Sequence, residues 1–472
     1  MVHDVSVLFD SNYYKIIEWQ INPISINNFL PIVKDVRYHI EHHIKDHNSY
    51  WYIRTNMNAT NWKIMKYDSL SSLSWSNLTE FIPSNPIVYI KDFCPYETFF
   101  TFETTINGNT YLHIIDPERT TVKSITHVEN KIMTWNEYIS VDFSQITSEN
   151  VYTISSGINF IYSTETFNII YSSMTSPTTL FDYDIDTLEN KKVYTQIVPN
   201  YDESLYDSKR IWIKQEGTRL GIPVSLVYRK DLYKEDGSNP VYLYGYGSYG
   251  ITITPDFDYE ILPLLDRGFV YAIAHIRGGS FLGYDWYMQG KMEHKMNTFN
   301  DFIKCAQYFK NKNENSKIII EGRSAGGLLV GACTVLQPDL FWMAIPGVPF
   351  VDVLNTMSDS TIPLTIEEWT QWGNPNEKES FDYMNKYCPY TNIKNTSYPH
   401  MYCTAGLHDP RVPYWEILKL LSKIREYKTD KNIQVIRIET QQGHFGGSSR
   451  YKSIDQLSEK YAFIFSLHTN KN

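Results

Sequence analysis

The stretch EGRSAGG, residues 321–327, joins an apolar run at 318–320 to a second apolar run at 328–330. This pattern predicts a buried strand that turns through a serine directly into a helix. On such a turn the hydroxyl leaves the sheet only if the residues two positions away carry no side chain, as Gly322 and Gly326 do. A bare G-x-S-x-G also occurs in ordinary glycine-rich turns, but the flanking runs favour Ser324 as the nucleophile of a hydrolase.

Two later positions supply the acid and the base that a nucleophilic serine needs. Asp409 and His444 each follow a predicted strand, and both come after the serine, as the acid and the histidine do in this class of hydrolase. His444 would take the proton of Ser324, and Asp409 would hold the imidazole in the working tautomer. The alternatives are that Asp409 only caps a loop and that His444 only packs against its neighbours. His408, beside the acid, is a rival base on the other loop.

The second part of the chain, residues 205–472, alternates between strand and helix patterns. Strands are predicted at 224–228, 241–244, 269–274, 318–320, 401–405 and 433–438, and helices at 298–309 and 327–336. This alternation predicts a mostly parallel sheet with helices on both faces. The site would then lie at the carboxyl ends of the strands.

The first part, residues 1–204, has a different pattern. Short alternating or aromatic runs are separated by clusters of Asn, Asp, Gly, Ser and Thr; they lie at 50–53, 62–65, 99–102, 111–115 and 169–171. These runs predict antiparallel β structure. Strand-turn-strand units recur loosely, which favours a propeller over a sandwich by a narrow margin.

Five motifs resemble the prolyl oligopeptidase family, and within it most of all the oligopeptidase B group. They lie at 244–250, 276–279, 297–302, 321–327 and 406–409, and the resemblance runs from about residue 38 to the C-terminus. It implies an α/β-hydrolase domain with a Ser-Asp-His site, preceded by a β-propeller, and a serine peptidase that acts on short peptides.

The resemblance also implies roles for residues around the triad. Tyr246 matches a tyrosine whose hydroxyl helps to form the oxyanion hole, and the N–H of Ala325 matches the second donor. Arg411 matches an arginine that binds a substrate carbonyl, and Tyr249 matches an aromatic side chain of the primary specificity pocket. The alternatives are a Tyr246 packed beneath a glycine turn and an Arg411 in a surface ion pair.

Two positions depart from the family's pattern for substrate specificity. Oligopeptidase B cuts after Arg or Lys, and the resemblance links this to a pair of glutamates; here residues 368–375 read EWTQWGNP, with Glu368 kept and Thr370 at the second position. A second acidic pair falls at 254–256, where only Asp256 carries charge. Because a buried cation is less fully compensated by one carboxylate than by two, we expect a weakened preference for basic residues.

The length of the first part is a third departure. A seven-bladed propeller at about 45 residues per blade needs about 300 residues, and this chain has room for about four blades. The expectation is a partial, N-terminally shortened propeller. Three explanations stay open: a natural short form, a fragment, or a partner chain that replaces the missing blades.

Composition limits the other classes of function. Of the 472 residues, 42% are hydrophobic and 20% charged, and the net charge of -10 argues against nucleic-acid binding. Five scattered cysteines without a C-x-x-C pair argue for a reducing compartment and against a disulfide framework or a zinc site. With no signal-like start and no apolar run long enough to cross a membrane, we expect a cytoplasmic protein without cofactor or metal. The oligomeric state stays open.

Three hypotheses about function remain. The first is a serine peptidase that cleaves short peptides through an acyl-enzyme, after Arg or Lys and with a weakened basic preference. The second is an esterase or acylaminoacyl hydrolase on the same fold, since Ser-His-Asp chemistry serves esters and amides alike. The third is a non-catalytic binding remnant, which is disfavoured because Ser324, Asp409, His444 and Tyr246 are all present.

Overall fold

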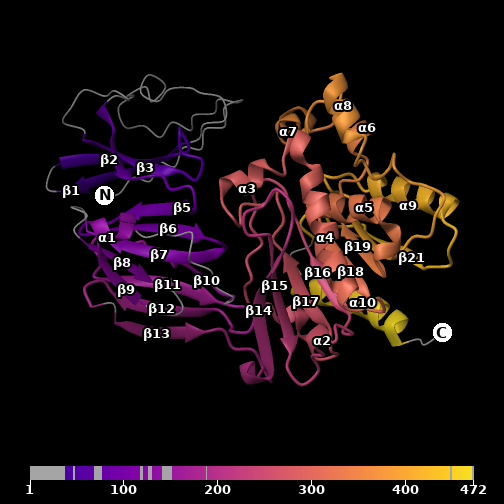
Figure 1. Ribbon diagram of the computed structural model, residues 1–472, viewed down its shortest axis with the longest axis horizontal. Coiled ribbons are helices and arrows are strands. Elements are labelled where there is room, and N and C mark those ends of the chain that lie inside the picture. The colour runs from indigo at the N-terminus through magenta and orange to yellow at the C-terminus, as the bar shows by residue number, and fades with distance from the viewer. Residues whose placement is uncertain are drawn as a thin grey trace. The chain divides into compact units, whose positions relative to one another are not determined.

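The computed structural model describes residues 38–45, 48–68, 77–116, 121–125, 130–140, 151–187, 189–446 and 449–469. The chain forms two compact units (Figure 1). Unit 1 comprises Met1–Pro199 with Leu282–Asp285, and unit 2 comprises Asn200–Phe281 with Trp286–Asn472. The boundary that the sequence suggests, at 204–205, lies just before the first strand of unit 2.

Unit 1 contains three antiparallel sheets within its described residues, and in each sheet the strand order is the chain order. The first sheet has β1 (Tyr38–Lys45), β2 (Asn48–Thr55), β3 (Lys63–Asp68) and β4 (Thr79–Ile82). The second has β5 (Val88–Pro95), β6 (Phe100–Ile106), β7 (Asn109–Ile115), β8 (Thr121–Ile125) and β9 (Asn130–Thr134), followed by α1 (Trp135–Ser140). The third has β10 (Thr153–Ser156), β11 (Thr166–Ser172), β12 (Thr179–Asp184) and β13 (Asn190–Thr195).

Buried aromatic and aliphatic side chains hold these sheets against one another. Tyr52 of the first sheet contacts Phe100 of the second, with ring centroids 4.9 Å apart. Tyr96 and Phe99, at the β5–β6 turn, pack edge-on against Phe167 of the third sheet. Small meander sheets that pack face to face in sequence are the arrangement of propeller blades.

A short segment from the middle of the sequence also belongs to unit 1. The Tyr284 N–H donates to Asn61 Oδ1 at 3.1 Å, and the ring of Tyr284 meets Trp62 edge-on at 6.2 Å. Gly283 has φ +103°, and a Cβ there would lie 2.5 Å from Asn61 Oδ1. The close approach of the two segments therefore requires glycine at this position.

Unit 2 is built on one eight-stranded sheet, in the order β14-β15-β17-β16-β18-β19-β20-β21. The strands are β14 (Tyr206–Ile213), β15 (Ile222–Arg229), β16 (Val241–Tyr244), β17 (Val270–Ala274), β18 (Ile318–Arg323), β19 (Met343–Gly347), β20 (His400–Gly406) and β21 (Gln434–Glu439). The pairs β14–β15 and β15–β17 are antiparallel. The remaining neighbours in this order, from β17 through β16 to β21, all pair parallel. The prediction of a mostly parallel sheet is confirmed.

The helices of unit 2 connect these strands. They are α2 (Leu262–Leu265), α3 (Tyr284–Met288, which begins in the segment of unit 1), α4 (Met296–Lys312), α5 (Ala325–Leu336), α6 (Val353–Ser358), α7 (Thr365–Trp372), α8 (Lys378–Met384), α9 (Trp415–Tyr427) and α10 (Arg450–Thr469). Figure 1 shows α4, α5 and α9 together beside the parallel strands. Both predicted helices are confirmed, each with slightly different ends.

Helices cover both faces of the sheet. Successive residues of a strand point to opposite sides, so neighbouring residues pack into different cores. Leu243 and Ile320 belong to a core that includes side chains of α4, α5 and α9. Their neighbours in sequence, Tyr242 and Ile319, belong to a second core that includes Tyr461 of α10. The two-layered core leaves the carboxyl ends of the parallel strands as the place where loops can carry a site.

Candidate active site

Ser324 occupies a strained turn between β18 and α5. Its φ of 59° and ψ of -117° lie outside the regions that L-residues favour. A Cβ on Gly322 would lie 2.3 Å from the Gly326 carbonyl oxygen, and one on Gly326 would lie 2.9 Å from the Gly245 carbonyl oxygen. The steric need for glycine on both sides of the serine is therefore confirmed.

Two backbone hydrogen bonds hold the turn in place. The Ser324 N–H donates to the Gly347 carbonyl at the end of β19, at 2.8 Å, and the Ser324 carbonyl accepts from Leu328 in the first turn of α5, at 3.1 Å. Ala325 is the first residue of α5, so its N–H has no partner within the helix. This N–H is available to a ligand beside the serine.

The structure brings Asp409 and His444 to Ser324. His444 Nε2 lies 2.9 Å from Ser324 Oγ, and His444 Nδ1 lies 2.7 Å from Asp409 Oδ2. Asp409 follows β20 and His444 follows β21, so three strand ends supply the three side chains. The side chains of His444 and Asp409 are 5% and 0% exposed. With a proton on Nδ1, the imidazole donates to Asp409 and accepts from the serine hydroxyl.

Local contacts fix the direction of the Asp409 carboxylate. Its Oδ1 accepts the N–H groups of Arg411 at 2.8 Å and Val412 at 2.9 Å. This leaves Oδ2 for the histidine. Burial is the main reason that the pKa of His444 lies below its usual value; the hydrogen bond with Asp409 opposes this shift, and Arg323 and Arg411 add to it. The imidazole is therefore neutral at neutral pH and can act as a base.

Arg323 joins the serine turn to the histidine loop. Its guanidinium donates from Nη2 to the main-chain carbonyl of His444. Burial lowers the pKa of this arginine. The residue beside the serine thus holds the loop that carries the imidazole, a contact that the sequence did not reveal.

Tyr246 lies in the loop after β16. Burial, with a smaller contribution from Glu368, raises the pKa of its hydroxyl to about 12, so the group is protonated at neutral pH. Within the described residues the hydroxyl makes no hydrogen bond. It is therefore free to donate to a ligand.

Glu368 and Tyr249, which the sequence places 119 positions apart, meet in unit 2. Glu368 Oε2 accepts from Tyr249 Oη at 2.8 Å and from Trp372 Nε1 at 2.7 Å. The rings of Tyr249 and Trp372 meet edge-on at 5.7 Å. Burial raises the pKa of Glu368, and the two hydrogen bonds oppose that rise.

Trp372 was not among the predicted site residues. Glu368 and Trp372 lie four residues apart on α7, a spacing that puts two side chains on one helix face. Had residues 368–372, EWTQW, been assigned to a helix, their spacing would have placed Glu368 and Trp372 side by side.

The other two predicted substrate residues have different surroundings. The Arg411 guanidinium lies 4.9 Å from the centroid of the exposed Phe445 ring. Asp256 accepts a hydrogen bond from Thr254 Oγ1, a contact local to its loop that does not link it to Tyr249 and Glu368.

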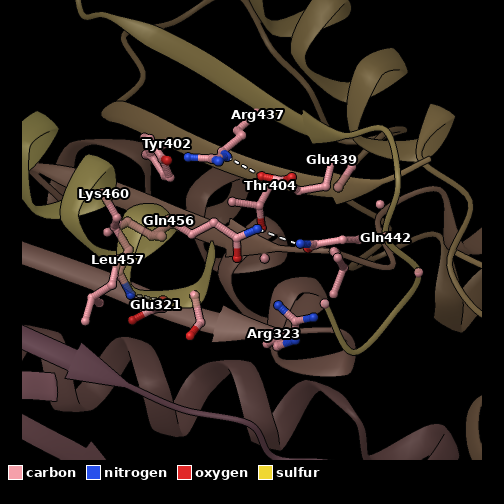
Figure 2. A pocket seen from close by; sticks show the side chains of 18 of the residues that line it. Glu321, Arg323, Tyr402, Thr404, Arg437, Glu439, Gln442, Gln456, Leu457 and Lys460 are labelled. Carbon is pink, nitrogen blue, oxygen red and sulfur yellow. Dashed lines mark hydrogen bonds and ion pairs between the residues drawn. The ribbon is translucent and has the colours of Figure 1, made fainter. Parts of the chain in front are cut away.

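A cavity of about 260 Å³ lies behind the histidine loop, at the carboxyl ends of β18 to β21 and beside α10 (Figure 2). Arg323 lines it, whereas Ser324, Asp409 and His444 do not. Its other charges are largely paired: Lys460 Nζ lies 2.8 Å from Glu321 Oε1, and Arg437 pairs with Glu439. The cavity is thus separate from the predicted catalytic side chains.

Two kinds of feature are absent from the described part of the chain. No group of three His, Cys, Asp or Glu side chains there is arranged to hold a metal ion. In the same residues, no helix is both long enough and apolar enough to cross a membrane.

Comparisons with known proteins identify relatives of both units. The model of the prolyl oligopeptidase family matches residues 255–470, and that of the prolyl oligopeptidase N-terminal beta-propeller domain matches residues 13–196. A dipeptidyl aminopeptidase BI of Pseudoxanthomonas mexicana is 36% identical over 439 residues, which cover 92% of this chain and 57% of the relative. Protease 2 of Moraxella lacunata is 36% identical over 417 residues, covering 87% and 56%.

Solved structures agree with these matches. Oligopeptidase B from Leishmania major superposes with a TM-score of 0.81 at 35% identity, over 92% of this chain and 59% of that one. The chain thus spans less than two thirds of the length of each of these relatives. The predicted fold, a β-propeller domain with an α/β-hydrolase domain, is confirmed. The chain belongs to the prolyl oligopeptidase family.

Proposed function

We propose that this chain is a serine peptidase that hydrolyses peptide bonds through an acyl-enzyme. The observation that carries the proposal is the continuous chain of hydrogen bonds from Asp409 through His444 to Ser324. His444 Nε2 takes the hydroxyl proton as Ser324 Oγ attacks the peptide carbonyl carbon, and then gives that proton to the leaving amine nitrogen. Water, deprotonated by His444 Nε2, then attacks the acyl-serine ester; the same imidazole nitrogen returns the proton to Ser324 Oγ as the ester bond breaks and the carboxylic acid leaves.

Two donors beside the serine would stabilise the tetrahedral intermediate. The Tyr246 hydroxyl, protonated and without a partner among the described residues, and the Ala325 N–H are the groups that we assign to the developing oxyanion. Loss of one such donor typically lowers kcat by about 100- to 1000-fold. Arg411, two residues after Asp409, would bind a substrate carbonyl.

We further propose cleavage after Arg or Lys, with a weaker preference than a two-carboxylate pocket would give. Glu368 supports this because one oxygen of its buried carboxylate takes the two pocket donors, Tyr249 and Trp372, while Oε1 accepts no hydrogen bond within the described residues. This oxygen can pair with a cation. Thr370 and Thr254 leave it without a second acid at the positions that the family's pattern provides.

A reducing compartment, such as the cytoplasm, is the proposed location. Cys305, Cys333, Cys388 and Cys403 are buried thiols in unit 2. Buried, reduced cysteines are typical of intracellular proteins.

Labelling with a fluorophosphonate tests the nucleophile directly, because Ser324 Oγ would displace fluoride from phosphorus. We expect labelling of the wild-type chain and none of the Ser324→Ala variant, which should unfold at the same temperature. A solved structure of oligopeptidase B from Trypanosoma brucei, to which this chain is 36% identical, contains covalently bound antipain, so antipain should compete with the label. Labelling that persists in Ser324→Ala would overturn the proposal.

Peptide libraries then test the substrate class. Substrates with Arg, Lys, Ala or Pro before the cleaved bond, each with a blocked and a free N-terminus, separate internal cleavage from removal of dipeptides. We expect Arg and Lys substrates to be cleaved best. Equal cleavage of Ala or Pro substrates would contradict the assigned pocket.

A further inference from the structure

A buried lysine lies beneath the loop that carries Tyr246. Lys295 directly precedes α4, and its side chain is 1% exposed. Its ammonium donates to the Gly247 carbonyl at 2.5 Å and to Ser248 Oγ at 2.8 Å. The rings of Phe299 and Trp372 face it, with centroids 5.8 and 5.2 Å away. Within the described residues it forms no ion pair with a carboxylate.

This position is costly for a charge. Burial lowers the pKa of Lys295 to about 7, and no carboxylate of the described residues pairs with it to offset the shift. Moving an ammonium out of water without a carboxylate is strongly unfavourable in general. A methionine has a similar shape and would pack here without that cost. Packing of α4 therefore does not account for a lysine, whereas its two hydrogen bonds to the loop do.

The two acceptors lie between the two tyrosines assigned to the site, Tyr246 and Tyr249. Gly247 has φ +71°, and a Cβ there would lie 2.4 Å from Thr298 Cγ2 at the start of α4. The loop is also held at its ends, where the Gly245 N–H donates to the Glu321 main-chain carbonyl at 3.1 Å and the Gly250 N–H donates to the Gly278 carbonyl at 3.0 Å. Lys295 thus anchors the middle of a loop that has backbone contacts at both ends.

We infer that Lys295 is a positioning residue that holds the Tyr246 hydroxyl where the oxyanion forms. The inference rests on the proposed function, because it needs Tyr246 to act as an oxyanion donor. Lys295 does not itself touch the reacting atoms; it acts through the carbonyl of Gly247 and the hydroxyl of Ser248. A donor that is misplaced by a shift of this loop loses most of its effect on the transition state.

A double-mutant cycle tests this inference. With the best peptide substrate, Tyr246→Phe is expected to lower kcat by about 100-fold and Lys295→Met by about 10-fold, with little change in KM. In the Tyr246→Phe background, Lys295→Met should lower kcat by about twofold or less, because the donor that it positions is already gone. Ser248→Ala, which removes one of the two acceptors, should show a smaller effect with the same dependence on Tyr246.

Lys310→Met is the matched control. Lys310 lies near the other end of α4 and also donates to a main-chain carbonyl, that of Ser316, at 3.0 Å. The kcat of Lys310→Met should equal that of the wild type. If Lys295→Met does not fold, the cycle of Ser248→Ala with Tyr246→Phe decides the matter.

Equal loss of kcat from Lys295→Met in both backgrounds would overturn the inference and leave the peptidase proposal standing. It would show that the lysine supports packing, and a lowered unfolding temperature should accompany it. A wild-type chain without Ser324-dependent labelling or turnover would overturn the proposed function and the inference together.

Discussion

The serine turn and the proposed Glu368 pocket, made of Tyr249, Glu368 and Trp372, lie in the same unit but are built in different ways. The turn at 321–327 is largely local: a Cβ on Gly322 would lie 2.3 Å from the Gly326 carbonyl oxygen, four residues away, while the close neighbour of Gly326 is the Gly245 carbonyl oxygen at 2.9 Å. The pocket joins Tyr249, from the loop after β16, to Glu368 and Trp372 of α7 through side-chain hydrogen bonds. Under the proposed function, the chemistry would depend on a short motif, and the specificity on contacts between distant segments.

This difference indicates where change is tolerated. A local motif fails as a whole when one glycine acquires a side chain, whereas a pocket can lose one carboxylate and keep its shape. Thr370 illustrates the second case: its hydroxyl donates to the Glu367 carbonyl within α7, and the helix persists without the second glutamate. Substitutions in the two regions should therefore affect different measured quantities.

The largest effect is expected for Asp409→Asn. An amide at this position would disfavour the tautomer of His444 that accepts the serine proton, so kcat should fall by about 10⁴-fold while folding is retained. Steady-state kinetics and thermal unfolding measure the two quantities. A decrease below tenfold would show that the carboxylate does not orient His444.

Gly322→Ala tests the local nature of the serine turn. Because the new Cβ would lie 2.3 Å from the Gly326 carbonyl oxygen, backbone must move, and we expect the free energy of unfolding to fall by about 3 kcal/mol. Gly347→Ala, at the end of the neighbouring strand, is the control, since its nearest neighbour would be Thr404 Oγ1 at 3.5 Å. Denaturant unfolding of both variants measures the difference, and equal losses would contradict the steric argument.

The pH dependence tests the electrostatics of the histidine loop. The imidazole must be neutral to accept a proton, so kcat/KM should fall about tenfold per pH unit on the acid side of the His444 pKa. Since burial places that pKa below its ordinary value of 6.5, the midpoint of the acid limb should lie below pH 6.5. A midpoint above 6.5 would show that Asp409 dominates over burial.

Glu368→Gln tests the pocket without altering the triad. The amide keeps an acceptor for Tyr249 and Trp372 but loses the charge, so kcat/KM for Arg substrates should fall by about 30-fold. Substrates with Ala at that position should be affected less than about threefold. Equal losses for both substrates would mean that Glu368 supports the loop and does not bind the cation.

Thr370→Glu, which adds a carboxylate to the proposed pocket, should give the smallest effect. A second carboxylate on α7 is expected to raise the ratio of Arg to Ala cleavage by about threefold, and the ionic-strength dependence of that ratio should increase. The Glu367 side chain, which is exposed on the same helix, provides the control variant Glu367→Gln. No change in the ratio would place residue 370 outside the pocket.

Periodicity and turn chemistry predicted much of the fold. The strands at β15, β16, β17, β18, β20 and β21 follow apolar runs bounded by turn residues. β19 was missed because Met343–Gly347 is short and contains a proline and a glycine, residues that count against a central strand. β14 was missed because Lys209 and Arg210 interrupt its pattern, although Arg210 is buried in the fold.

The amino-acid sequence was enough to predict the serine turn, the order of Ser324, Asp409 and His444, and the strand ends on which they lie. These features depend on sterics and hydrophobic periodicity, which act mostly over a few neighbouring residues. The folded chain shows in addition that the three side chains converge, that Trp372 shares Glu368 with Tyr249, and that Lys295 reaches the Gly247 carbonyl. Side-chain direction and burial depend on what packs around a residue, and segments far apart in the chain supply those neighbours.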